Sequence, residues 1–132
     1  MNITYKTNAP LKAEELAEVF KSSGINRPVE DLDRMEKMIA NADILVSAWD
    51  GDQPVGIARA ITDFVYSCYL SDLAVRKDYQ NLGIGKELVN VLHEHLGDES
   101  MLLLLAAPSA IDYYPKIGFD KLDCAFIIPR VK

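Results

Sequence analysis

Apolar and polar positions along the chain repeat first with the period of a strand and then with that of a helix. Residues 2–6 alternate and predict a short strand. Apolar residues at helical spacing follow, and they predict helices over about 11–22 and 29–41. The apolar run over 43–50 predicts a further strand, and the sequence Asp50-Gly51-Asp52-Gln53 is typical of a hairpin turn.

The remaining residues predict further strands and helices in the same way. In chain order these are strands over 54–64 and 65–75, a long helix over 83–97, an almost continuous apolar strand over 101–107, a short helix over 108–118 and a last strand over 125–129. Hairpins followed by helix-connected crossovers indicate an α/β fold whose sheet has mixed pairing. A chain of 132 residues buries one core but not two, so we expect a single domain over 1–132.

Composition narrows the partners and the compartment. The net charge of −6 argues against nucleic acid or an anionic membrane as the main partner, because both favour a basic surface. No apolar run approaches the roughly 20 residues that span a bilayer, and the N-terminus lacks a signal pattern. Cys68 and Cys124 lie far apart, which favours free thiols over a disulfide and gives no metal-ligand spacing. We therefore expect a cytoplasmic protein without a metal.

The stretch Tyr69–Lys86, YLSDLAVRKDYQNLGIGK, carries the candidate chemistry. An apolar strand leads through a polar turn to Gly83 and Gly85, where the long helix begins. The first turn of a helix has unpaired N–H groups and the positive end of the helix dipole. Glycines allow that backbone to approach a phosphate closely. The segment from Gln80 to Gly85 therefore predicts a pyrophosphate cradle.

This cradle differs from two common phosphate-binding motifs. A Walker loop requires Ser or Thr after its lysine, whereas Lys86 is followed by Glu87. A dinucleotide fingerprint requires a third glycine where this chain has Leu88. The run instead resembles the Q/R-x-x-G-x-G/A acyl-CoA loop of the GNAT superfamily of N-acetyltransferases, and the preceding Asp72-Leu73-Ala74-Val75 is also typical of that superfamily.

A second segment carries the same resemblance. The sequence Ala110-x-x-Tyr113-Tyr114-x-Lys116-x-Gly118-Phe119 is similar to the superfamily's A-x-x-F-Y-x-K-x-G-F segment. The two signatures occur in the family's order and cover roughly residues 43–120. The chain is identified as a GNAT member, which implies a central mixed sheet, splayed between its fourth and fifth strands and flanked by helices.

The resemblance also implies a site for acetyl-CoA as cosubstrate. Backbone groups of the fourth strand would bind the pantetheine arm, and N–H groups at the start of the long helix would bind the pyrophosphate. The cofactor-binding residues expected on this basis are Leu73, Ala74, Val75, Gln80, Asn81, Leu82, Gly83, Ile84, Gly85 and Lys86. Arg76, Lys77 and Lys86 either meet the phosphates by charge or form ordinary solvated surface.

The resemblance assigns the catalytic acid but not the base. Tyr114 takes the position of the tyrosine that protonates the departing CoA thiolate in many members. Asp72, Asp63 and Glu30 are candidates for the base, and none can be assigned. Ala107 stands where an Asn is usual, which removes one cofactor contact. The short tail after Phe119 either leaves the acceptor site open or is completed by a second subunit of a homodimer.

The acceptor expected from the family is a primary amine of a small molecule or peptide, acetylated by direct attack in a ternary complex. The residues available to line its pocket are Phe20, Trp49, Arg59, Phe64, Tyr66 and Tyr69. A non-catalytic acyl-CoA-binding module is the alternative, and the presence of Tyr114 disfavours it. A member acting on charged tRNA is disfavoured by the acidic composition.

Overall fold

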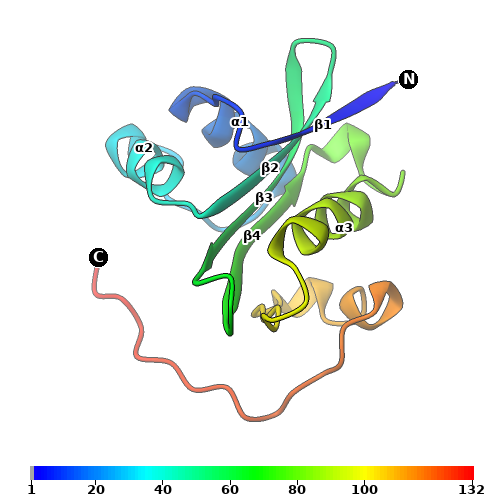
Figure 1. The fold of residues 1–132 in the computed structure, drawn as a ribbon. Helices are drawn as coiled ribbons and strands as arrows, with labels where there is room; N and C mark the ends of the chain where they lie inside the picture. Colours follow the sequence, from blue (N-terminus) through cyan, green and yellow to red (C-terminus); the bar gives the residue numbers. More distant parts are fainter. Residues whose placement is uncertain (1) are drawn as a thin grey trace.

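The computed structural model describes residues 2–132, which form one antiparallel sheet with helices on both faces (Figure 1). The strands are β1 (Ile3–Thr7), β2 (Ile44–Asp50), β3 (Gln53–Thr62) and β4 (Cys68–Val75), in the spatial order β1-β2-β3-β4. The helices are α1 (Ala13–Ser23), α2 (Leu32–Ala40) and α3 (Ile84–Leu96), with short 3-10 helices η1 (Lys77–Tyr79), η2 (Pro108–Ala110) and η3 (Tyr114–Ile117). The expected α/β fold is confirmed, but the expected mixed pairing is not: the four strands pair antiparallel throughout. The predicted helix over 108–118 is divided into η2 and η3.

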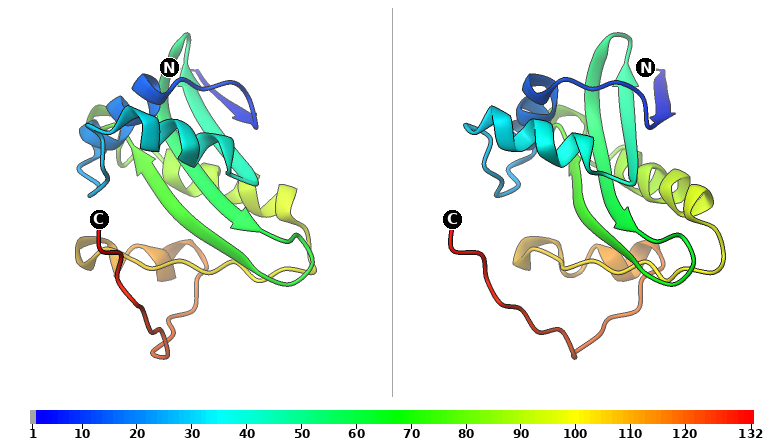
Figure 2. Two further views of the ribbon diagram at one scale, coloured as in Figure 1. Left: turned by 90° about the vertical axis from the view of Figure 1, so that its left-hand side faces the viewer. Right: turned by 60° about the vertical axis from the view of Figure 1, so that its left-hand side comes forward.

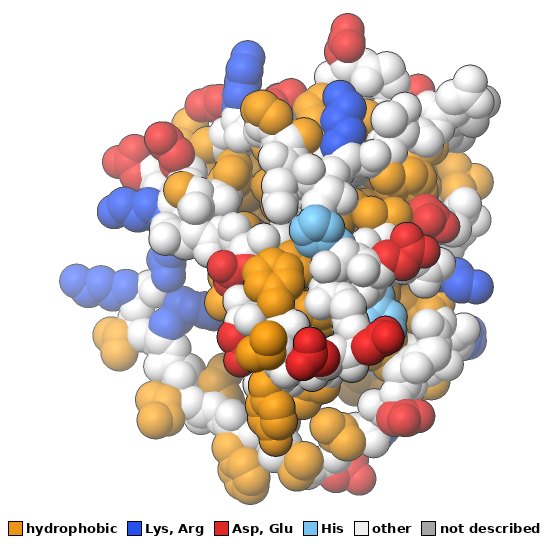
Figure 3. Space-filling model, in the orientation of Figure 1, with side chains coloured by type: hydrophobic (Ala, Val, Ile, Leu, Met, Phe, Trp, Pro, Cys, Tyr) orange, Lys and Arg blue, Asp and Glu red, His pale blue; other side chains and the backbone are white. Residues whose placement is uncertain are grey.

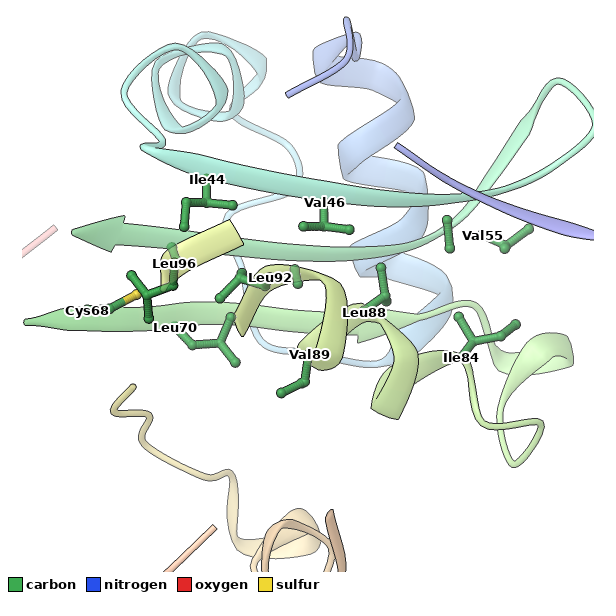
Figure 4. Packing of buried hydrophobic residues seen from close by; sticks show 13 residues of the cluster. Ile44, Val46, Val55, Cys68, Leu70, Ile84, Leu88, Val89, Leu92 and Leu96 are labelled. Carbon is green, nitrogen blue, oxygen red and sulfur yellow. The ribbon is translucent and has the colours of Figure 1, made fainter. Parts of the chain in front are cut away.

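Side chains alternate along the strands and divide the core into two layers. Helices α1 and α2 cover one face of the sheet and α3 covers the other (Figures 1 and 2). Ile44 and Val46 point from β2 toward α3, where Leu88 and Leu92 meet them (Figure 4). Leu45, between them, packs in the cluster of α1 and α2. Both faces are apolar, so β2 reads as a continuous apolar run rather than an alternating one.

A β-bulge interrupts β4 beside the centre of the sheet. Asp72 pairs with Arg59 and Leu70 pairs with Ala60, which leaves Ser71 as the extra residue. A bulge bends its strand and redirects the side chains that follow. As a result, Leu70 and Leu73 both lie on the α3 side, although strand residues three positions apart normally face opposite sides of a sheet.

The predicted strand over 101–107 is reduced to a single point of contact. Leu103 forms one parallel bridge with Tyr69, in which Leu70 N–H donates to Leu103 O (2.8 Å) and Leu103 N–H donates to Cys68 O (2.9 Å). Beyond this bridge no described residue pairs with the outer edge of β4. The prediction of a central strand was wrong, because an apolar run indicates burial but does not specify a partner. The departure from β4 is the splay that the resemblance implied.

The predicted last strand over 125–129 is also absent. Residues after Phe119 form no helix or strand, and Phe126 and Ile128 are 97% and 95% exposed. The segment runs free along the lower edge of the view before it turns toward α2 (Figure 1). There Arg34 Nη2 donates to Lys132 O (3.0 Å). A strand needs an edge to pair with, and its expected neighbour over 101–107 is not itself a strand.

Candidate functional site

The turn before α3 exposes a row of backbone donors. Asn81 (φ 65°) and Gly83 (φ 84°) both have left-handed backbone conformations, and Gly83 is the N-cap of α3. Among residues 2–132, none accepts a hydrogen bond from the N–H groups of 81–86. The helix dipole adds partial positive charge at the same place. The arrangement suits an anion, as the sequence predicted.

Two hydrogen bonds hold this turn against the sheet. Tyr79 Oη donates to Asp50 Oδ2 (2.6 Å), which ties η1 to the β2–β3 hairpin. Gln80 Nε2 donates to Val75 O (2.9 Å), so its side chain braces the loop against β4. Gln80, expected to bind cofactor, therefore has its amide engaged within the protein. The turn is fixed before any ligand arrives.

The outer edge of β4 is open next to this turn. Arg76 N–H donates to Val55 O (2.8 Å), so hydrogen-bonded and non-hydrogen-bonded pairs alternate from that point. Leu73 and Val75 fall at the non-hydrogen-bonded positions, and their N–H and C=O groups face away from β3. Ala74 differs from the expectation, because its backbone faces β3 and its side chain is buried in the α1 cluster.

The two sequence signatures meet at the start of α3. A Cβ added to Gly85 would lie 2.8 Å from Tyr113 Oη, so the tyrosine needs this glycine to approach the helix. Tyr113 packs edge-on against Tyr114 (ring centroids 5.3 Å apart), and Tyr114 packs similarly against Phe119 (5.5 Å). Through Tyr113, this aromatic row connects Tyr114 to the first turn of α3, which carries part of the row of donors.

The Tyr114 hydroxyl is free to act on a ligand. It makes no hydrogen bond to any described residue, and no side-chain polar atom there is both buried and unpartnered, so the hydroxyl reaches the surface. Burial raises the pKa of Tyr114 and neighbouring Tyr113 raises it further, while the Arg27 guanidinium opposes both. The phenol therefore keeps its proton at neutral pH, as a general acid must.

Asp72 is not available as a base. Its side chain is fully buried, Arg27 Nε donates to its Oδ1 (2.5 Å) and Arg59 Nε donates to its Oδ2. Both carboxylate oxygens are thus engaged by guanidiniums, and neither is free to face an acceptor. Arg27, 45 residues away in sequence, was missed because nothing in a single sequence links it to Asp72.

The other two candidate bases gain no support. Asp63 Oδ1 accepts hydrogen bonds from the N–H groups of Val65, Tyr66 and Ser67 (2.9–3.0 Å) and so organises the β3–β4 turn. These bonds, that from Ser67 foremost, lower the pKa of Asp63 and make it a weaker base. Glu30 is exposed and makes no ion pair within residues 2–132.

The residues expected to line the acceptor pocket separate into three groups. Phe20 and Trp49 belong to the buried core, where Trp49 Nε1 donates to Ser47 Oγ (2.8 Å). Phe64, Tyr66 and Tyr69 are exposed on or near the β3–β4 turn. Arg59 alone faces the bulge. Arg76 also differs from the expectation, because it bonds Pro54 O (2.7 Å) and Glu18 (3.2 Å).

Neither a metal centre nor a membrane span is present in the described chain. No three His, Cys, Asp or Glu side chains within residues 2–132 gather closely enough to hold a metal ion. None of the described helices combines the length and the hydropathy needed to cross a bilayer.

Comparison with known proteins identifies the class. The family described as "Acetyltransferase (GNAT) domain" matches residues 8–127. The chain therefore belongs to the GNAT family of acetyl-CoA-dependent N-acetyltransferases.

Individual relatives agree with this class. The chain is 28% identical over 127 residues to an uncharacterized N-acetyltransferase, ycf52, of Pyropia yezoensis, covering 91% of this chain and 71% of that protein. It is 28% identical over 118 residues to GCN5-related N-acetyltransferase 1, chloroplastic, of Arabidopsis thaliana. That match covers 86% of this chain but only 59% of the Arabidopsis protein.

Solved structures share the fold. A probable acetyltransferase from meticillin-resistant Staphylococcus aureus superposes with a TM-score of 0.84 at 22% identity, over 98% of this chain and 100% of that one. The PaiA N-acetyltransferase of Thermoplasma acidophilum, solved in complex with coenzyme A, superposes with a TM-score of 0.73 at 18% identity, over 95% and 94% of the two chains.

Proposed function

We propose that this chain transfers the acetyl group of acetyl-CoA to a primary amine of a small molecule or peptide, by direct attack in a ternary complex. One observation carries the proposal. The open edge of β4 leads directly into the row of free N–H groups over 81–86, and Tyr114 packs on Tyr113, which reaches the first turn of α3. Open backbone donors and acceptors in this continuous arrangement favour a long ligand that ends in phosphate.

The residues present fit acetyl-CoA. The N–H groups of Asn81 through Lys86 would hold the pyrophosphate, with exposed Lys86 adding charge. The outward N–H and C=O groups of Leu73 and the N–H of Val75 would bond the pantetheine arm. Acetyl-CoA supplies an activated acetyl group as a thioester. An N–H near Val75 would polarise the carbonyl of that thioester and so stabilise negative charge on its oxygen during attack.

Tyr114 donates the proton in this proposal. The amine nitrogen forms the new bond to the acetyl carbon, the carbon–sulfur bond breaks, and the phenol protonates the departing thiolate. Its burial beside Tyr113 and its free hydroxyl support this role. No carboxylate considered above takes a proton from the amine, so we propose that the amine enters as its free base and that the proton lost from its nitrogen as the amide forms passes to water.

The test compares Tyr114→Phe with Tyr66→Phe, a matched removal of a hydroxyl from a tyrosine that is 76% exposed on the β3–β4 turn. General acid catalysis contributes about a hundredfold to ten-thousandfold, so we expect turnover to fall by at least about a hundredfold in Tyr114→Phe. Stabilisation by acetyl-CoA in a thermal melt should persist in both variants. Full turnover in Tyr114→Phe across the pH range would remove the tyrosine from the mechanism.

Turnover and the thermal melt together also distinguish the enzyme from the alternative function. A non-catalytic acyl-CoA-binding module would be stabilised by acetyl-CoA and by CoA but would acetylate no amine in a broad screen. Ala107, which replaces a usual cofactor contact, is the feature that favours this alternative. We prefer the enzyme because Tyr114 is present and packs on Tyr113, which reaches Gly85 in the first turn of α3.

We further propose that the C-terminal segment packs against a second copy of the chain. Its exposed apolar side chains are Leu122, Phe126, Ile127, Ile128 and Val131, and apolar side chains gather along the lower margin of the molecule over this segment (Figure 3). Isolated apolar residues on a surface are ordinary, but an extended row with an unpaired backbone favours strand addition. Sedimentation velocity across concentrations should reveal a dimer, and a monomer throughout would contradict the proposal.

A cytoplasmic location also remains our proposal. Cys68 is buried and Cys124 is exposed, and neither is in a disulfide. An exposed free thiol favours a reducing compartment.

A further inference from the structure

Two arginines share one carboxylate on the α1 side of the sheet. Arg27 and Arg59 each direct their Nε to Asp72, and the side chains are 27%, 10% and 0% exposed, respectively. The three groups sum to one net positive charge. Asp72 accepts from each guanidinium with one oxygen, but its single negative charge balances only one of the two positive charges. A mostly buried excess charge is costly unless an anion or water reaches it.

The hydrogen bonds of the two guanidiniums show that the donor without a partner belongs to Arg59. All three nitrogens of Arg27 are engaged, by Asp72, by Asn26 O (2.7 Å) and by Ser71 O (2.8 Å). Arg59 uses Nε on Asp72 and Nη2 on Ser71 Oγ (3.0 Å), while its Nη1 donates to nothing within residues 2–132. Since no described side-chain nitrogen is both buried and unpartnered, Nη1 must reach the surface.

This free nitrogen lies where an acceptor would approach. Arg59 pairs across the sheet with Asp72, and its Nη2 bonds the bulge residue Ser71. Two residues beyond the bulge, Leu73 begins the open edge proposed for the pantetheine arm. Arg27 is near enough to Tyr114 to oppose the burial-driven rise in the pKa of that phenol. The cationic cluster therefore adjoins the start of the open edge, and one of its arginines lies within electrostatic reach of the proposed acid.

We propose that the acceptor is an amine that also carries a carboxylate, of the amino acid kind, and that Arg59 Nη1 binds that carboxylate. A simple protonated amine would be repelled by the net positive cluster, whereas a zwitterion brings a carboxylate that pairs with it. The net charge of −6 on the whole chain favours cationic acceptors, so a preference for zwitterions over simple amines would have to come from this local cluster. The inference rests on the proposed acetyltransferase function and names its substrate class.

The first test uses the unmodified chain with matched acceptors. Phenylalanine, phenylalaninamide and 2-phenylethylamine share one side chain, and only phenylalanine carries a carboxylate; lysine, lysinamide and cadaverine form a second set. CoA release gives kcat/KM for each, corrected for the free-base fraction of the amine. A charge-assisted hydrogen bond predicts a preference of about ten- to a hundredfold for the acids. Equal or better turnover of the neutral partners would overturn the inference.

Variants then test whether Arg59 is the source of the preference. Arg59→Met leaves the Asp72–Arg27 pair intact and should abolish the preference for carboxylates through KM, while Arg59→Lys should retain part of it. Arg34→Met, at a partly buried arginine on α2, is the matched control and should keep the preference. A thermal melt checks folding. An unchanged preference in a folded Arg59→Met would overturn the assignment.

Failure of the inference can be told apart from failure of the proposed function. If amines are acetylated without regard to a carboxylate, only the inference fails. If no amine is acetylated, binding of N-acetylphenylalanine is compared with that of its amide on CoA-saturated protein by calorimetry. Tighter binding of the acid would support the carboxylate site even then, and equal or weaker binding would overturn it.

Discussion

Gly83 offers a sharp test of the cradle, because the chain contains a matched control for it. Gly83 has φ 84° and ψ 4° at the start of α3, and Gly24 has φ 84° and ψ 3° at the end of α1. A Cβ added at either position meets nothing within 4 Å. The two alanine variants should therefore carry the same backbone strain, about 1–2 kcal/mol in this conformation, and no steric clash with the protein.

The expected losses follow from these numbers. Each variant should lower the melting temperature of the free chain by roughly 3–8 °C for a domain of this size. Acetyl-CoA at a hundred times its Kd should stabilise the wild type and Gly24→Ala by about 2.7 kcal/mol. In Gly83→Ala the Cβ adjoins the free N–H groups of 81–86, and a tenfold loss of affinity would reduce that stabilisation to about 1.4 kcal/mol.

Differential scanning fluorimetry of the wild type and both variants, each with and without acetyl-CoA, measures these losses and stabilisations. Equal losses in the free chains confirm that strain is matched, and the ligand-dependent shift then reports on the cradle alone. If both variants gain the same stability from acetyl-CoA, the proposed role of Gly83 in holding the pyrophosphate is refuted. No shift in any of the three proteins at millimolar acetyl-CoA would remove the cofactor site altogether.

The remaining predictions concern buried charge and pH. Asp72→Asn leaves two guanidiniums without a carboxylate in a buried site, and we expect a loss of about 3–5 kcal/mol in the free energy of unfolding measured by urea titration. A loss below about 1 kcal/mol would show that water already compensates the cluster. For Tyr114, burial raises the folded-state pKa above the unfolded value of about 10. The folded chain therefore binds that proton more tightly, so its contribution to stability is complete below pH 10 and disappears as the pH rises through the folded pKa. Turnover should likewise fall only above pH 10, and Tyr114→Phe should lack this limb; a fall near pH 8 would point to another group.

Much of the fold could be predicted because it depends on local patterns. The glycines at 83 and 97 limit α3 in the sequence and in the structure, and the hairpin turn at Asp50 joins β2 to β3 as expected. The predicted strand over 65–75 begins later, at Cys68, because the Asp63 carboxylate binds three N–H groups of the residues that follow and holds them in a turn. Such capping is invisible to hydrophobic periodicity.

The parts that could not be predicted depend on contacts between distant residues. The sequence offers Asp72 as one of three candidate bases, yet two arginines from other parts of the chain pair with it in a buried site. The apolar run over 101–107 has the composition of a central strand, and only its position relative to β4 reveals that it pairs at Leu103 alone. Composition describes what a segment would bury, whereas pairing depends on which edges remain available.

Two contacts hold the segment that carries Tyr114. One is the bridge between Leu103 and β4, and the other is the approach of Tyr113 to Gly85. The Leu103 bridge fixes the segment where it begins to diverge from β4, and the Tyr113 contact fixes it against the first turn of α3. An acyl group longer than acetyl that required a wider gap would move this segment, and that movement would separate Tyr113 from the helix and shift Tyr114 from the position proposed for it beside the thioester sulfur. If Tyr114 is the acid, as proposed, the width of the gap and the position of the acid change together, and we expect a longer acyl group to be disfavoured because it displaces Tyr114.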